Sequence, residues 1–127
     1  MAGGLLTRIA KARGMPLSVR TAGLAAHDGE CVAPQALEVM REVDIDISHE
    51  HAKSVTEADL AWADIVVGLD QRHLGYLADE YPTVASKLRW IGNDVKDPYL
   101  GSLAVYRATR DELERLFGEA VARLFSK

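Results

Sequence analysis

The loop Asp97-Pro98-Tyr99 carries the residue types in this chain that best suit acid–base chemistry. Proline biases the residue before it toward extended backbone, so Asp97 is expected on a stiff loop that presents its carboxyl. A carboxyl held in this way suits a general acid that protonates a leaving oxygen. The Tyr99 ring beside it is suited to pack on an aromatic substrate. On the tripeptide alone an ordinary turn is the better interpretation, because Asp-Pro is a common turn starter, and a general-acid site is the alternative.

The chain offers no evident nucleophile to act with Asp97. Its only cysteine, Cys31, follows Glu30 and lies near Asp28, and these negative charges disfavour a thiolate. The next arginine along the chain, Arg41, is beyond the spacing at which a cysteine and an arginine hold one phosphate. We therefore predict that Cys31 is an ordinary loop thiol or a partly buried one.

Two further acidic sites fit a structural role better than a catalytic one. Asp44 and Asp46 form the Asp-x-Asp pattern of haloacid-dehalogenase phosphatases, but that pattern should end a hydrophobic strand, and residues 38–42 look helical. A solvated connection is the better interpretation. Asp70 follows the apolar run 65–69, at a strand end where ligands often bind. It is also placed to cap the helix that follows, and we favour this role.

His49 and His51 are the candidate metal ligands. They would share one face of an extended backbone, from which two imidazoles can hold a metal ion. Their nearest acidic neighbour, Glu50, would point to the other face, so surface histidines are the better interpretation. We expect neither a metal nor a cofactor.

Helical and strand patterns alternate along the chain. Apolar residues at helical spacing, with local cap and stop signals, predict helices over residues 3–13, 34–42, 56–62, 71–81 and 102–125. Short apolar or alternating runs predict strands over residues 17–21, 64–69 and 87–91. Residues 43–51 fit either a strand or an extended connection. The alternation predicts a three-layer α/β fold, in which a short parallel sheet carries helices on both faces.

Length and composition set the class of protein. The 127 residues, 48% hydrophobic and 27% charged, fit a single soluble globular domain over residues 1–127. The net charge of −4 argues against nucleic-acid binding, which selects basic faces. No apolar run approaches the roughly 20 residues that span a bilayer, and the N-terminus lacks a signal-peptide pattern. With one cysteine there is no internal disulfide, so we expect a cytoplasmic protein.

Five segments, in order along the chain, resemble the low-molecular-weight protein tyrosine phosphatase family. They are Thr21-Ala22-Gly23, Asp46-Ile47-Ser48, residues 52–56, residues 63–70 and Asp97-Pro98-Tyr99. Each segment is weak alone, but together they are in register over essentially the whole chain. The resemblance implies a flavodoxin-like fold, with Asp97 as the general acid and Tyr99 in the substrate groove.

The chain departs from the family pattern at its start. The family opens with a strand and a phosphate loop, Cys-x-x-x-x-x-Arg-Ser/Thr, followed by Pro-Met-Ala-Glu and the first helix. Met1-Ala2 corresponds to that Met-Ala, so we expect this chain to lack the first strand, the nucleophilic thiolate and the phosphate-binding arginine. Gly3 also replaces the usual glutamate, Thr21 stands where serine is usual, and Glu50 stands where a supporting histidine is common. Because a general acid needs an attacking group to assist, we expect no hydrolysis of phosphotyrosine.

Three functional interpretations stay open. The chain is a catalytically silent member of the family, an N-terminally truncated form of an active tyrosine phosphatase or arsenate reductase, or a non-catalytic binding or regulatory module. Arsenate reduction fits less well, because it needs a thiolate and, in thioredoxin-coupled forms, further cysteines. As partners we expect a phosphoprotein, another protein, or a second copy in a homo-oligomer. The strands near Val19 and Val67 should either pair directly or be bridged by another copy.

Overall fold

The computed structural model describes residues 1–24 and 28–125 of the chain. Within them, the α-helices are α1 (Ala2–Ala12), α2 (Pro34–Arg41), α3 (Glu57–Trp62), α4 (Gln71–Glu80) and α5 (Leu103–Leu124). The strands are β1 (Val66–Gly68) and β2 (Leu88–Trp90), and a 3-10 helix, η1 (Pro82–Lys87), leads into β2. No helix in this part of the chain is long and apolar enough to cross a membrane.

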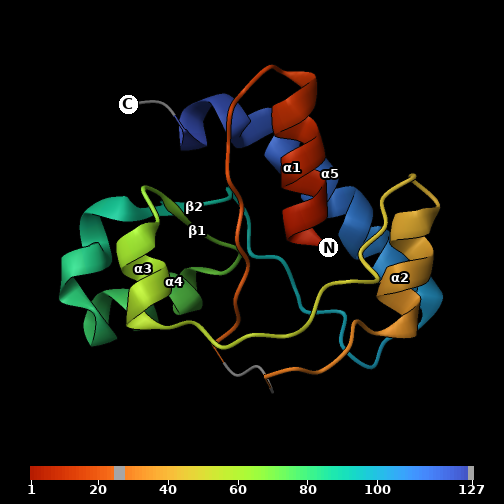
Figure 1. Cartoon of the computed structure of the whole chain (residues 1–127), viewed down its shortest axis with the longest axis horizontal. Coiled ribbons are helices and arrows are strands. Elements are labelled where there is room, and N and C mark those ends of the chain that lie inside the picture. The colour runs from red at the N-terminus through yellow and green to blue at the C-terminus, as the bar shows by residue number, and fades with distance from the viewer. Residues whose placement is uncertain (25–27, 126–127) are drawn as a thin grey trace.

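The parallel sheet has helices on both of its faces. β1 pairs with β2 in parallel, and Val66 lies opposite Leu88. These two side chains pack on a small core cluster that α3, α4 and η1 form. Val67, one residue further on, packs instead against the main core, which α1, α2 and α5 build. The predicted α/β architecture is therefore confirmed, and Figure 1 shows the two groups of helices on opposite sides of the molecule.

Local sequence signals explain the helix boundaries, each of which was predicted to within one residue. At α3, Thr56 Oγ1 accepts a hydrogen bond from the Asp59 amide at 3.2 Å, and Asp59 Oδ2 accepts one from the Thr56 amide at 3.1 Å. This reciprocal capping box satisfies two amides that the helix itself cannot pair. Pro34 opens α2, and Ser102 caps α5 through the Val105 amide.

The predicted strand over residues 17–21 is wrong. Residues 15–22 run as a long, stretched trace after α1 (Figure 1), and none of them belongs to a strand. Their side chains alternate as predicted, since Leu17 and Val19 are half-buried whereas Ser18 and Arg20 are exposed. The alternation describes the two faces of an extended backbone, but a ladder also needs a neighbouring strand, and the described residues supply none. Direct pairing near Val19 and Val67 is therefore absent here, because the sheet contains β1 and β2 alone.

Residues 43–51, which fitted either a strand or an extended connection, lie in the segment that joins α2 to α3. Residues 43–51 form turns and irregular backbone, with one isolated antiparallel bridge between His51 and Cys31. A second isolated bridge, this one parallel, joins Ser54 to Gly23. The two predicted strands over 64–69 and 87–91 are present but shorter, as β1 and β2.

A buried arginine ties α2 to α5. The Arg110 side chain is 8% exposed, and it donates to the Val39 carbonyl at 2.8 Å and to Glu42 Oε1 at 2.7 Å. Arg107, one turn earlier, donates to both carboxylate oxygens of Glu42 at 2.9 and 2.7 Å. The hydrogen bonds from Arg107, and then those from Arg110, lower the pKa of Glu42 from its ordinary 4.5 to about 2. The network fixes the position of α2, which carries part of the candidate site described below.

We expect the stability of the fold to decline in acid because of this network. The pKa of Glu42 is lower in the folded chain, so its ionised form stabilises the fold above pH 4.5, and this contribution is lost as the pH falls toward about 2. Urea midpoints of the native chain and Glu42→Gln, measured from neutral pH down to about 2, should converge in acid. Glu38→Gln, an exposed change on the same helix, is the control and should follow the native curve. A constant difference between native and Glu42→Gln at every pH would contradict the assignment.

Candidate active site

The loop that carries Asp97 is anchored at the carboxyl end of the sheet. The Val95 amide donates to the carbonyl of Leu69, the residue after β1, at 2.8 Å. Asp97 Oδ1 accepts a hydrogen bond from the Tyr99 amide at 3.0 Å, and the Gly101 amide donates to the Pro98 carbonyl at 2.7 Å. Asp97 itself is exposed. The structure therefore presents this carboxyl to solvent from a loop whose backbone is internally bonded.

Apolar side chains stand out from the same loop. Tyr99 is 64% exposed and Leu100 is 83% exposed. Leu100 also has a φ of 64°, in the left-handed region that a leucine seldom occupies. A loop in this conformation, with large apolar side chains facing water beside a carboxyl, is suited to receive a ligand.

The loop borders a cavity of about 280 Å³ that joins segments far apart in sequence. Tyr106 of α5 is buried in its lining, and Gln35 of α2 donates to the Gly101 carbonyl at 3.3 Å. Burial, followed by the nearby Asp97 and Tyr99, raises the pKa of the Tyr106 phenol. The sequence predicted Tyr106 as a member of the apolar stripe of α5, and nothing in its pattern marked it, or Gln35, as a neighbour of Asp97.

Cys31 lies in the lining of this same cavity. It is an exposed loop residue, as one of the two predicted alternatives has it, and Glu30 lines the cavity beside it. The lining residues are Glu30, Cys31, Ala33, Pro34, Gln35, Tyr99, Leu100 and Tyr106. They include no arginine or lysine, so the structure brings Cys31 near the Asp97 loop without a cation that would hold a phosphate there.

The remaining acidic candidates have structural roles. Asp70 is buried and accepts a hydrogen bond from the Arg72 amide at 2.7 Å, so it caps α4 as predicted. The Arg72 side chain and amide lower the pKa of Asp70. Asp46 accepts from the Ser48 amide at 2.9 Å, and Asp44 sits in the turn after α2 with a φ of 61°. The interpretation of this pair as a solvated connection is confirmed.

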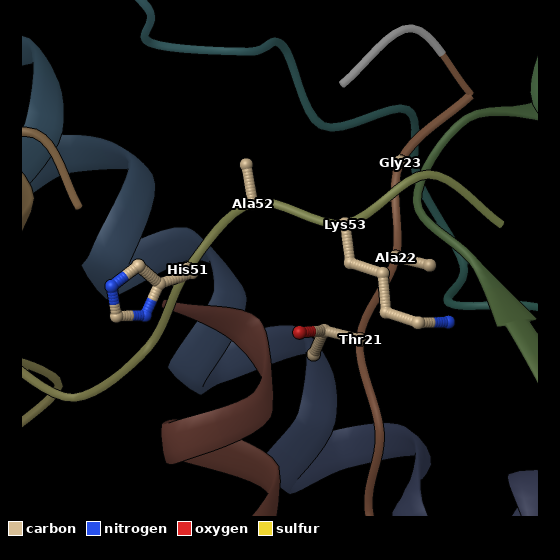
Figure 2. Close-up of a pocket in the computed structure, with 6 residues that line it drawn as sticks. All are labelled: Thr21, Ala22, Gly23, His51, Ala52 and Lys53. Atoms are coloured by element: carbon tan, nitrogen blue, oxygen red, sulfur yellow. The ribbon is translucent and has the colours of Figure 1, made fainter. Parts of the chain in front are cut away.

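A second cavity, of about 230 Å³, lies beside the stretched segment that precedes residue 24. Figure 2 shows its lining, in which the side chains of His51 and Lys53 point away from each other. The Lys53 amine pairs with Asp59, and His51 Nδ1 lies 3.1 Å from the His49 carbonyl. Within the described residues, no three His, Cys, Asp or Glu side chains gather as a metal site.

The start of α1 adjoins this second cavity. A Cβ built on Gly3 would lie 2.7 Å from Cγ2 of Thr21, so only glycine fits there without a shift. Gly3 and Thr21, at which we expected departures from the family pattern, are therefore close neighbours. Glu50, the third such position, lies near the start of α1. Burial lowers the pKa of the Met1 amine, and Glu50 opposes that effect.

Comparison with known proteins gives matches over nearly the whole chain. A family model described as low molecular weight phosphotyrosine protein phosphatase matches residues 1–127. A protein-arginine-phosphatase of Bacillus subtilis (strain 168) is 30% identical over 131 residues, covering 98% of this chain and 87% of that protein. Arsenate reductase 1 of Bacillus cereus is 32% identical over 96 residues, covering 76% of this chain and 66% of that protein. The crystal structure of a low molecular weight protein tyrosine phosphatase from T. tengcongensis superposes with a TM-score of 0.89 at 35% identity, covering 97% and 88% of the two chains.

Proposed function

Because the chain belongs to the low molecular weight phosphotyrosine protein phosphatase family, we propose that Asp97 is the general acid of a phosphoryl-transfer site and that Tyr99 lines its substrate groove. The likeness in structure confirms the expected flavodoxin-like fold of that family. The proposal for Asp97 is supported by its exposure at the carboxyl end of the sheet, on a loop fixed by the 3.0 Å bond from the Tyr99 amide. That bond occupies Oδ1 and leaves Oδ2 to meet a substrate.

In the proposed reaction, Asp97 protonates the atom that leaves the phosphorus. We propose a phosphorylated protein side chain as the substrate. Once its bond to phosphorus breaks, the dephosphorylated side chain leaves along the exposed face of Tyr99. Tyr106 packs behind the loop and holds it in place.

The nucleophile is the part that this chain does not supply. Phosphate-monoester cleavage of this kind needs a thiolate of low pKa, a nest of amides around the phosphate oxygens and an arginine. Cys31 is the only cysteine of the sequence, and its cavity has an acidic residue and no arginine in its lining. The residue six positions after Cys31 is Leu37, so the only cysteine does not open a Cys-x-x-x-x-x-Arg loop. These observations support the proposal that the 127 residues alone are catalytically silent.

Two other functions remain as alternatives. A form of the chain that includes the strand and loop would be an active phosphatase, or an arsenate reductase like the relative from Bacillus cereus. If the chain works without them, it is a binding module for a phosphoprotein or another protein. Arsenate reduction is the weaker alternative. Its electrons come from two thiols that form a disulfide, and the sequence holds no second cysteine to supply the second thiol.

We expect the 127-residue chain to leave p-nitrophenyl phosphate unhydrolysed at mildly acidic pH. Native chain, Cys31→Ser and Asp97→Ala should all match the rate of buffer alone, because none of them has an attacking group to assist. The absorbance of released nitrophenol measures the rate of hydrolysis. Turnover that disappears in Asp97→Ala would overturn the proposed silence, whereas turnover that survives both substitutions would indicate a contaminating phosphatase.

A further inference from the structure

The cavity beside Tyr99 has the size of a site for one side chain. Sites that enclose a whole drug-sized ligand measure roughly 300–1,000 Å³. At about 280 Å³, this cavity is small for such a ligand. Tyr99 belongs to its lining and follows Asp97 by two residues in the acid loop, residues 93–101. A side chain bound in the cavity would therefore lie near the group that Asp97 is proposed to protonate.

The walls of the cavity suit an aliphatic chain that ends beside an aromatic ring. Leu100, Ala33 and Pro34 supply apolar surface, and Leu100 is 83% exposed. Tyr99 adds an aromatic ring and is 64% exposed. A long side chain in the cavity would cover apolar atoms that otherwise face water, and this burial favours binding.

The charge in and around the cavity is negative. Glu30 is an exposed residue of the lining, and its carboxylate forms no ion pair with any residue that the structure describes. Asp97 raises the pKa of the Tyr106 phenol, so its carboxylate acts on the same cavity. The lining contains no lysine or arginine, and Lys96 of the acid loop lies outside it. An occupant of the cavity would therefore gain from a positive charge.

The backbone holds both walls of the cavity in place. The Gly29 amide donates to the Ala52 carbonyl at 2.9 Å, and the Ala52 amide donates to the Glu30 carbonyl at 2.8 Å. Gln35 then joins this side of the cavity to the acid loop through the Gly101 carbonyl. Because these bonds fix the two walls before anything binds, an occupant has less chain to order, which lowers the cost of binding.

We propose that this cavity binds a lysine or arginine side chain of the substrate protein, with the cationic head against Glu30 and Tyr99 and the aliphatic stem along Leu100. The stem of such a side chain covers apolar surface while its head keeps a polar partner. The face of an aromatic ring also attracts a cation. The inference rests on the proposed function only in naming the occupant as part of the substrate. The preferred substrates are then phosphoproteins with a basic residue near the phosphorylated one.

Other occupants fit the cavity less well. An apolar side chain would take water from the Glu30 carboxylate and give it no partner in return, which costs free energy. An anion would face Glu30 and the nearby Asp97 without a cation in the lining. The cationic side chain is the occupant that satisfies the walls and the charge together.

The test is an NMR titration of the native 127-residue chain with two synthetic peptides. One is acetyl-Gly-Gly-Arg-Gly-amide, and the other has citrulline in place of arginine, which keeps the shape of the side chain and removes its charge. We expect the arginine peptide to shift the amide signals of Cys31 and Leu100 and to bind about tenfold more tightly than the citrulline peptide. An exposed ion pair and a cation–π contact together supply a difference of this size.

Three variants separate the local charge from the charge of the whole chain. Glu30→Gln and Tyr99→Leu should each reduce the preference for arginine to about threefold, because each removes one of the two contacts with the cation. Glu80→Gln is the matched control, since it removes an exposed carboxylate on α4 and changes the net charge by the same amount. The full preference for arginine should persist in this control.

Three results would overturn the proposal. Equal binding of the two peptides would show that the cavity does not select a charge. A preference that falls as much in Glu80→Gln as in Glu30→Gln would show attraction to the net charge of the chain. Signals of Cys31 and Leu100 that shift with protein concentration, without peptide, would assign this surface to a second copy. The titration involves no hydrolysis, so Asp97 can fail as a general acid while the cationic site stands, and the reverse is equally true.

Discussion

Placing a strand and a Cys-x-x-x-x-x-Arg loop ahead of Met1 is expected to give a chain that hydrolyses p-nitrophenyl phosphate, in which Asp97→Ala lowers kcat by about 10²–10⁴-fold. The loss follows from the proposed role of Asp97, because the leaving oxygen would depart as an unprotonated anion. The effect should fall on kcat more than on KM, since the carboxyl assists in the transition state and adds little to the binding of the substrate.

A near-isosteric substitution and a control variant separate catalysis from folding. Asp97→Asn keeps the shape of the side chain but cannot donate a proton as an acid, so in the extended chain it should lower kcat about as much as Asp97→Ala does. Asp79→Ala changes an exposed carboxyl on α4, outside the lining of the cavity at the acid loop, and should leave kcat unchanged. An active extended chain whose Asp97→Ala variant keeps native kcat would refute the assignment of the acid.

Gly3→Ala is expected to destabilise the native chain by about 1–3 kcal/mol, and Thr21→Ser is expected to abolish that cost. The added Cβ would lie 2.7 Å from Cγ2 of Thr21, the one methyl group that serine lacks. The next atoms, of Val19 and Thr21, are 3.9 and 4.0 Å away, at ordinary contact distance. In the Thr21→Ser background the alanine should therefore fit. Its higher helix propensity should then raise the free energy of unfolding by up to about 1 kcal/mol.

A double-mutant cycle in urea measures this coupling, and the neighbouring glycine provides its control. A Cβ on Gly4 would meet Ile45 at 3.0 Å and Met40 at 3.3 Å, away from Thr21. Gly4→Ala should therefore cost the same free energy with threonine or serine at position 21. A Gly3→Ala cost that persists in the serine background would mean that the two positions are independent.

The sequence predicted those parts of the fold that local signals determine. The Thr56–Asp59 capping box and the apolar periodicity of residues 102–125 define their helices without help from the rest of the chain. The strand over 17–21 was wrong because alternation reports burial, and pairing depends on a neighbour that no local pattern contains. The cavity at Tyr99 was not predicted because α2 and α5 build it, as the bond from Gln35 to Gly101 shows. The conformation of Leu100 had no signal either, since nothing in its neighbours requires a positive φ.

The division of the core into two clusters has a consequence for the cooperativity of unfolding. α1 and α2 make their main contacts with α5, whereas α4 contacts η1 and the two strands. The smaller cluster contains three buried side chains, Leu60, Leu77 and Val84, and the main cluster contains many more. Regions joined by so short a ladder open as separate units, and the unit with fewer buried contacts opens at lower free energy. We therefore expect amide hydrogens of residues 56–90 to exchange at a lower free energy of opening than those of α5, which lies in the main cluster.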